Sequence, residues 1–93
     1  MVNYAIHPEV LGPKSGFVSP DMLGPLHDHI EKLGGGKAVF MNGAQGGMVT
    51  SDCRGADGKD IQTWEECIRI GNLLAEESIR IIKDAPIQKD PVL

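Results

Sequence analysis

Apolar residues gather in four stretches of the chain, and their spacing predicts two strands and two helices. Residues 2–6 alternate imperfectly and lead into His7-Pro8, where the proline favours extended backbone at His7 and stops a strand. Residues 22–33 carry apolar side chains at helical spacing. The run 38–41 is continuous and suits a buried strand, with pairing expected from Lys37 to about Met41. A second helical pattern covers residues 64–83.

The first helix has two candidate starts. Ser19 as N-cap, Pro20 at the first helical position and Asp21 in the first turn form one start signal. Gly24-Pro25 then either kinks the helix or marks a second start one turn later. The glycines at 34–36 predict its end, with Lys32 in the last turn.

The second helix has the clearer start. Thr63 and Glu66 fit a capping box, in which each side chain accepts the other residue's backbone N–H. One apolar stripe follows and predicts the core face, with Trp64 as its largest member. The stripe consists of Trp64, Cys67, Ile68, Gly71, Leu74, Ala75, Ser78, Ile79 and Ile82.

The order strand, helix, strand, helix predicts an α/β fold, a single β-α-β-α domain over residues 1–93. A right-handed crossover makes the two strands parallel. Two strands are too few for a stable sheet, so we expect extra short strands from the loops or pairing between subunits of a homo-oligomer.

A glycine-rich bend follows the second strand, at the edge where open α/β sheets bind ligands. Its backbone N–H groups could hold an oxyanion or phosphate, and a tight turn required by topology is an equal alternative. P-loop and dinucleotide-binding spacings are absent. Thr50 and Ser51 are weak candidate catalytic hydroxyls, because no base is identifiable beside them. The candidate substrate-binding or anion-binding residues are Asn42, Gly43, Gln45, Gly46 and Gly47.

His7 is the candidate metal ligand. An imidazole held at a strand end by Pro8 has little freedom, as zinc ligands often do, although a hydrogen-bonded structural histidine fits the spacing as well. His27 and His29 are two apart on a helix, and we expect them to be solvated. Three acidic residues after the bend do not have the spacing of an EF-hand, so they predict a solvated loop rather than a cation site. They are Asp52, Asp57 and Asp60.

Charge and composition exclude some partners. The net charge of -4 and pI of about 5.2 argue against nucleic acid and anionic membrane surfaces. No apolar run approaches the roughly 20 residues that span a bilayer, and no basic-then-apolar leader opens the sequence. The compartment stays open. Cys53 and Cys67 are expected to be free thiols rather than one disulfide.

The order of motifs resembles a known family. Tyr4-Ala5-Ile6-His7-Pro8, a Ser-Pro-Asp helix start and the stretch from Ala38 to Gly46 are similar to an internal segment of the neutral/alkaline non-lysosomal ceramidase family, over roughly residues 3–86. The resemblance implies a zinc amidase that cleaves the N-acyl bond of ceramide, with His7 as a zinc ligand. The family's other ligands have no matching positions here, and its active-site serine falls near Val49, beside the hydroxyls of Thr50 and Ser51.

Three functions follow from these observations. The resemblance implies a segment of a ceramidase-like zinc amidohydrolase, acting on a lipid amide or another small amide once a longer chain or an oligomer completes it. The missing ligands instead favour a non-catalytic α/β module for binding or assembly. The glycine-rich bend on its own favours a small-anion binder.

Overall fold

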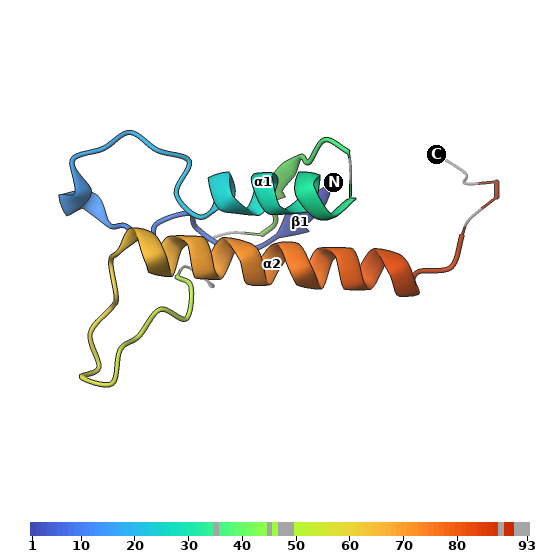
Figure 1. Ribbon diagram of the computed structural model, residues 1–93. Coiled ribbons are helices and arrows are strands. Elements are labelled where there is room, and N and C mark those ends of the chain that lie inside the picture. The colour runs from blue at the N-terminus through green and yellow to red at the C-terminus, as the bar shows by residue number, and fades with distance from the viewer. Residues whose placement is uncertain (35, 45, 47–49, 88, 91–93) are drawn as a thin grey trace.

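The chain forms a small α/β unit. The computed structural model describes residues 1–34, 36–44, 46, 50–87, 89 and 90. The elements are strand β1 (Val2–Tyr4), the 3-10 helix η1 (Pro13–Ser15), helix α1 (Leu23–Gly34), strand β2 (Phe40–Asn42) and helix α2 (Trp64–Asp84) (Figure 1). The predicted β-α-β-α order is confirmed, and the two strands are parallel.

The strands are shorter than predicted. Val2 pairs with Phe40 and Tyr4 with Asn42, and the Gly43 N–H donates to the Tyr4 carbonyl over 3.0 Å. The backbones stay close there, because a Cβ on Gly43 would lie 3.2 Å from the Ala5 nitrogen. β1 therefore ends at Tyr4 rather than Ile6, and β2 begins at Phe40 rather than Lys37. In the part of the chain that the structure describes, no third strand joins this sheet.

The prediction of a buried second strand is wrong. Val39 and Met41 are 54% and 53% exposed, whereas Phe40 between them packs against the hydrophobic core. The face that carries Met41 is therefore exposed. The opposite face is covered only at Val2 and Phe40, because Tyr4 and Asn42 are exposed too. A continuous apolar run normally indicates cover on both faces, but here about half of the Val39 and Met41 surface is exposed.

Helix α1 uses the later of its two predicted starts. Asp21 has a φ of 53°, which is left-handed, so the segment 19–21 cannot be a first helical turn. Instead the Ser19 hydroxyl accepts the Asp21 N–H over 3.0 Å and closes a local turn. α1 begins at Leu23 with Gly24 and Pro25 in its first turn, and it ends at Gly34 as expected.

Helix α2 keeps its predicted N-cap. The Thr63 hydroxyl accepts the Glu66 N–H over 3.3 Å. The reciprocal half of the capping box is wrong, because the Glu66 carboxylate binds Arg69 instead of the cap. A guanidinium is a stronger partner for a carboxylate than a neutral backbone N–H.

The core lies between α2, α1 and the loop after β1. Its buried members are Ile6, Val10, Leu11, Met22, Cys53, Cys67 and Ile70. The helices touch closely at Gly71, where a Cβ would lie 2.5 Å from the Met22 carbonyl oxygen. Figure 1 shows α1 and α2 side by side, with the long loops at one end of the pair and the chain termini at the other.

The predicted core face of α2 is confirmed for some of its residues and wrong for others. Cys67, Gly71 and Ala75 are buried as expected. Trp64 is 44% exposed and Ile82 is 63% exposed, and Ile68 is exposed too. The stripe missed Ile70 and Glu66, which are both buried. The buried face is rotated toward these two residues, because the loop carrying Cys53 packs on that side.

Candidate functional site at the carboxyl edge of the sheet

Parallel pairing brings the segments that follow β1 and β2 to one edge of the sheet. His7 lies three positions beyond the end of β1, partly exposed. Its Nδ1 is 3.9 Å from a carboxylate oxygen of Glu9, Oε2. Its Nε2 is buried and has no hydrogen-bond partner among the residues that the structure describes. The imidazole thus has one nitrogen facing a carboxylate and one unpaired.

Glu9 links the two segments. The Thr50 hydroxyl, which follows β2, donates to Glu9 Oε1 over 2.8 Å, while the other oxygen of the carboxylate faces His7. Glu9 is therefore the hydrogen-bond acceptor of Thr50, a residue beside which the sequence alone identifies no base. The available signal was a carboxylate two residues after a strand-end histidine, with Pro8 fixing the turn between them.

Ser51 points elsewhere. Its side chain is buried, and its hydroxyl donates to the Met22 sulfur over 3.4 Å. This contact turns Ser51 toward the core rather than toward His7 and Glu9. Of the two candidate hydroxyls, the structure places Thr50 at the edge and Ser51 in the packing beneath it.

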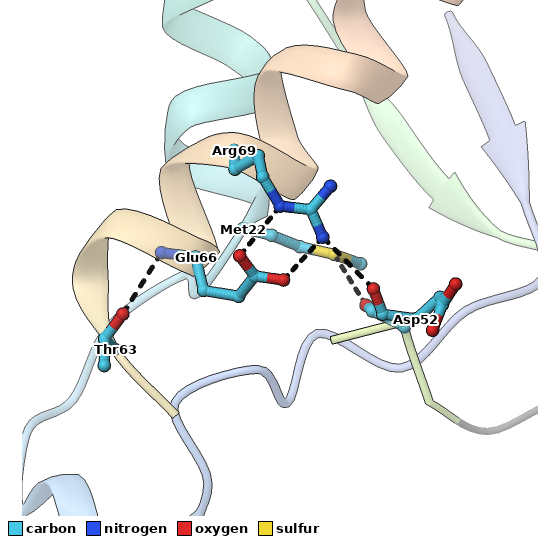
Figure 2. A network of polar contacts seen from close by, with 6 residues as sticks. Met22, Asp52, Thr63, Glu66 and Arg69 are labelled. Carbon is cyan, nitrogen blue, oxygen red and sulfur yellow. Dashed lines mark hydrogen bonds and ion pairs between the residues drawn. The ribbon is translucent and has the colours of Figure 1, made fainter. Parts of the chain in front are cut away.

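A polar network fixes the loop after Thr50 to the start of α2. Arg69 donates from Nε to Glu66 Oε2 over 2.7 Å and from Nη2 to the Asp52 carbonyl over 3.1 Å. Figure 2 shows this guanidinium between Glu66 and Asp52, with Thr63 capping the same turn. Hydrogen bonding from Arg69 holds the pKa of the Glu66 carboxyl below its ordinary value of 4.5.

The glycine-rich bend is described only in part. Gly43 donates its N–H to Tyr4, so that group is engaged in the sheet rather than free for an anion. Asn42 ends β2 with an exposed side chain, and Gly46 is exposed with a φ of 110°. The candidates Gln45 and Gly47 lie outside the described residues, as does Val49.

Two cavities flank Thr50 at this edge. One of about 140 Å³ has Glu9 and Asp60 in its wall, and one of about 400 Å³ has Asp52, Asp60 and Arg54. Carboxylates outnumber cationic groups in both linings. The local field therefore favours a cation or a polar neutral group over an anion.

The remaining histidines are partly buried, whereas they were expected to be solvated. His29 Nε2 lies 3.3 Å from Glu76 Oε1 on α2, and the Nε2 of His27 is buried without a partner in the described ranges. The expected solvated loop is confirmed at Asp52, Asp57 and Asp60, which are all exposed, but Ser51 and Cys53 in the same loop are buried.

Both cysteines are free, as predicted, and both are buried. Burial raises the pKa of the Cys67 thiol to about 12, and the neighbouring Asp21 carboxylate adds to the shift. Burial also raises the pKa of Cys53, with a contribution from Asp60. Neither cysteine is a thiolate at neutral pH, so neither is a candidate nucleophile.

The described residues do not form a complete zinc site. No group of three His, Cys, Asp or Glu side chains gathers within them, whereas zinc sites normally use three or four protein ligands. Glu9 lies beside His7 Nδ1, and the structure brings no second ligand to His7 Nε2 among the described residues. In the same described ranges, neither helix is long and apolar enough to cross a membrane.

Comparison with known proteins adds no assignment. No protein-family model, curated protein or solved structure matches this chain.

Proposed function

We propose that this chain is a segment of a ceramidase-like zinc amidohydrolase, inactive alone, that contributes one side of a site at the carboxyl edge of its sheet. The observation that carries the proposal is the arrangement around Glu9. One oxygen of this carboxylate faces the His7 imidazole and the other accepts the hydroxyl of Thr50. A candidate ligand and a candidate hydroxyl thus meet at one carboxylate, although they are far apart in the chain.

The unpaired nitrogen of His7 supports a role as a ligand. A buried polar atom without a partner costs roughly 1–3 kcal/mol, and a metal ion at His7 Nε2 would remove that cost. Metal-bound histidines commonly have a carboxylate at the other ring nitrogen, which orients the ring and raises its basicity. Glu9 lies on that side of His7.

Thr50 and Glu9 also suit amide chemistry. A hydroxyl becomes a nucleophile when an adjacent base takes its proton, and the two groups are already 2.8 Å apart. The same pair can orient a bound polar group without reacting. Because His7 is the one zinc ligand among the described residues, the proposal requires further ligands from a longer chain or another subunit. The substrate class is a lipid amide or another small amide.

Zinc binding tests this proposal most simply. We would titrate zinc against the wild type, His7→Ala and Glu9→Gln, using competition with a colorimetric chelator. The wild type is expected to bind zinc weakly, His7→Ala to lose at least about tenfold in affinity, and Glu9→Gln to lose about 10–100-fold as altered outer partners do. His27→Ala is the matched control, since His27 also has a buried unpaired Nε2. Equal losses in His27→Ala and His7→Ala would contradict the assignment.

A second candidate is a non-catalytic module for binding or assembly. The incomplete ligand set and the open face of the sheet, where Val39 and Met41 are exposed, favour it. Wild-type protein that shows no zinc binding in this titration, yet self-associates, would support this candidate over the first.

A further inference from the structure

The end of the molecule opposite the candidate site carries an apolar groove. It lies where the strands begin and where both helices end, and its volume is about 240 Å³. Its walls include Val2, Ile30, Val39, Ile79 and Ile82. Charged groups at its margin are already paired, because Lys37 donates to Glu31 over 2.7 Å. The groove is thus apolar, and neither charge of the Lys37–Glu31 pair is left unpaired at its margin.

Helix α2 extends past the core beside this groove. Figure 1 shows its last turns projecting beyond α1 and β1. The side that packs on the core through Leu74 and Ser78 continues at helical spacing to Ile81 and Ile82. Those isoleucines are 54% and 63% exposed, so among the described residues the apolar side of the helix continues beyond the part that the core covers.

The chain exposes more surface than a monomer of its size normally does. Its accessible area is 6910 Å², against roughly 5,200 Å² for a folded 10.0 kDa monomer, an excess of about 1,700 Å². Its radius of gyration is 14.8 Å, against roughly 12 Å expected for 93 residues. A stable interface buries about 800 Å² per partner, and obligate homodimers bury more. This excess is spread over the long loops as well as the amino end, and it exceeds the area that one partner of a stable interface buries.

The charges on the projecting helix are balanced within it. Arg80 donates to Glu77 over 2.7 Å and to Asp84 over 3.0 Å, both one turn away. Two copies can bring these ends together without setting one block of like charge against another. The projecting end of α2 and the groove also lie side by side on one molecule. The end of each copy can therefore fit the groove of the other, as a two-fold interface requires.

We propose that a second copy of this chain docks at this end, with the projecting part of α2 from each copy packed into the groove of the other. Ile81 and Ile82 are the inserted side chains, and Val39 and Ile79 belong to the receiving wall. This dimer leaves both carboxyl edges free. It does not depend on the proposed zinc site, so the two proposals can fail separately.

Sedimentation velocity tests the dimer directly, over protein concentrations from roughly 1 μM to 1 mM. The wild type is expected to change from monomer to dimer within this range. Ile82→Glu is expected to weaken association at least tenfold while the helical circular-dichroism signal is unchanged, because Ile82 is exposed in the monomer. Val39→Glu, in the receiving wall, is expected to act likewise.

Ile68→Glu is the matched control. It makes the same change in charge at another exposed isoleucine of α2, in the separate groove beside the start of α1. Its association is expected to equal that of the wild type. A wild type that stays monomeric throughout, or dissociation by Ile68→Glu as strong as by Ile82→Glu, would overturn the proposal. Zinc titration of the Ile82→Glu monomer keeps the two proposals distinguishable.

Discussion

The two ends of the parallel sheet differ in how their surroundings are stabilised. At the carboxyl end, long loops are tied to the helices by charged side chains. Asp21 is buried and accepts the N–H groups of Val10 and Leu11 at 3.0 and 2.9 Å, and that of Met22 at 2.7 Å. At the amino end, apolar side chains such as Ile82 have nothing against them in the described ranges.

The difference shows which end has its loops held by hydrogen bonds within the chain and which end leaves apolar side chains exposed. Buried polar groups are tolerated when they are hydrogen-bonded. Among the described residues of the carboxyl end, Asp21, Ser51 and Glu66 meet this condition and the His7 nitrogen does not. Exposed apolar area gives no such local solution, because only more chain or another molecule can cover it. This contrast is why we propose ligand binding at the carboxyl end and association at the amino end.

The substitution with the largest expected effect disrupts the scaffold that both ends share. Gly71→Ala sets a Cβ against the Met22 carbonyl and the Leu26 nitrogen, so α1 and α2 must move apart. Overpacking costs about 1–3 kcal/mol, and we expect about 3 kcal/mol here because the neighbours are backbone atoms. Urea unfolding measures the loss. Gly34→Ala is the control, because its new Cβ meets only the movable end of Ile79; equal losses would contradict the close approach.

The next effect is confined to the carboxyl end. Asp21→Asn keeps the left-handed backbone, which asparagine tolerates, but its amide nitrogen cannot accept an N–H. One of the bonds to Val10, Leu11 or Met22 is lost, at about 2 kcal/mol. Amide exchange should quicken first at Val10 and Leu11. Unchanged exchange there, with Asp28→Asn as the exposed control, would mean that the carboxylate does not hold this loop.

Trp64→Ala is expected to cost only about 1.5 kcal/mol. A core tryptophan would cost about 3–5 kcal/mol, but Trp64 is half exposed and its described aromatic neighbour is Phe17, with ring centroids 6.4 Å apart. Leu26→Ala, at a fully buried position, is the comparison and should cost more. Thermal unfolding of both variants shows which one loses more stability. A larger loss for Trp64→Ala would mean that Trp64 is a core residue after all.

The smallest expected effect depends on pH. Arg69→Leu should cost about 1 kcal/mol at neutral pH, since it removes the partner of a largely buried carboxylate. The folded-state pKa of Glu66 is lowered, so this contribution is present above the ordinary value of 4.5 and is lost as the pH falls through the lowered pKa. The wild type and the variant should converge in acid. Arg80→Leu, which removes an exposed ion pair at the other end, should match the wild type at every pH.

Much of the fold could be predicted from local signals. The Thr63 cap, the end of the first helix at Gly34 and the helical spacing on α2 act over a few residues, and the structure confirms them. The parallel order of the strands followed from connection rules. These features depend on neighbouring positions in the chain, which a single sequence displays.

The rest depends on contacts between distant segments. Asp21 looked like a residue of a first helical turn, and only its bonds to Val10 and Leu11 reveal its role. The position of Glu9 after His7-Pro8 was a local signal, but its pairing with Thr50 could not be predicted because the two residues are 41 positions apart. Trp64 was assigned to the core from its periodicity, but periodicity does not say how far a neighbouring element extends. A candidate site assembled from two loops is hidden for the same reason.

Amide hydrogen exchange of the wild type at a series of protein concentrations tests the contrast between the two ends most directly. The account predicts that protection rises with concentration in residues 78–84 of α2 and at Ala38 and Val39, because a second copy covers them. Protection of residues 9–17 and 50–60 should stay constant, because their bonds are formed within one chain. Concentration-dependent protection at the carboxyl edge instead, or no dependence at the amino end, would contradict the account.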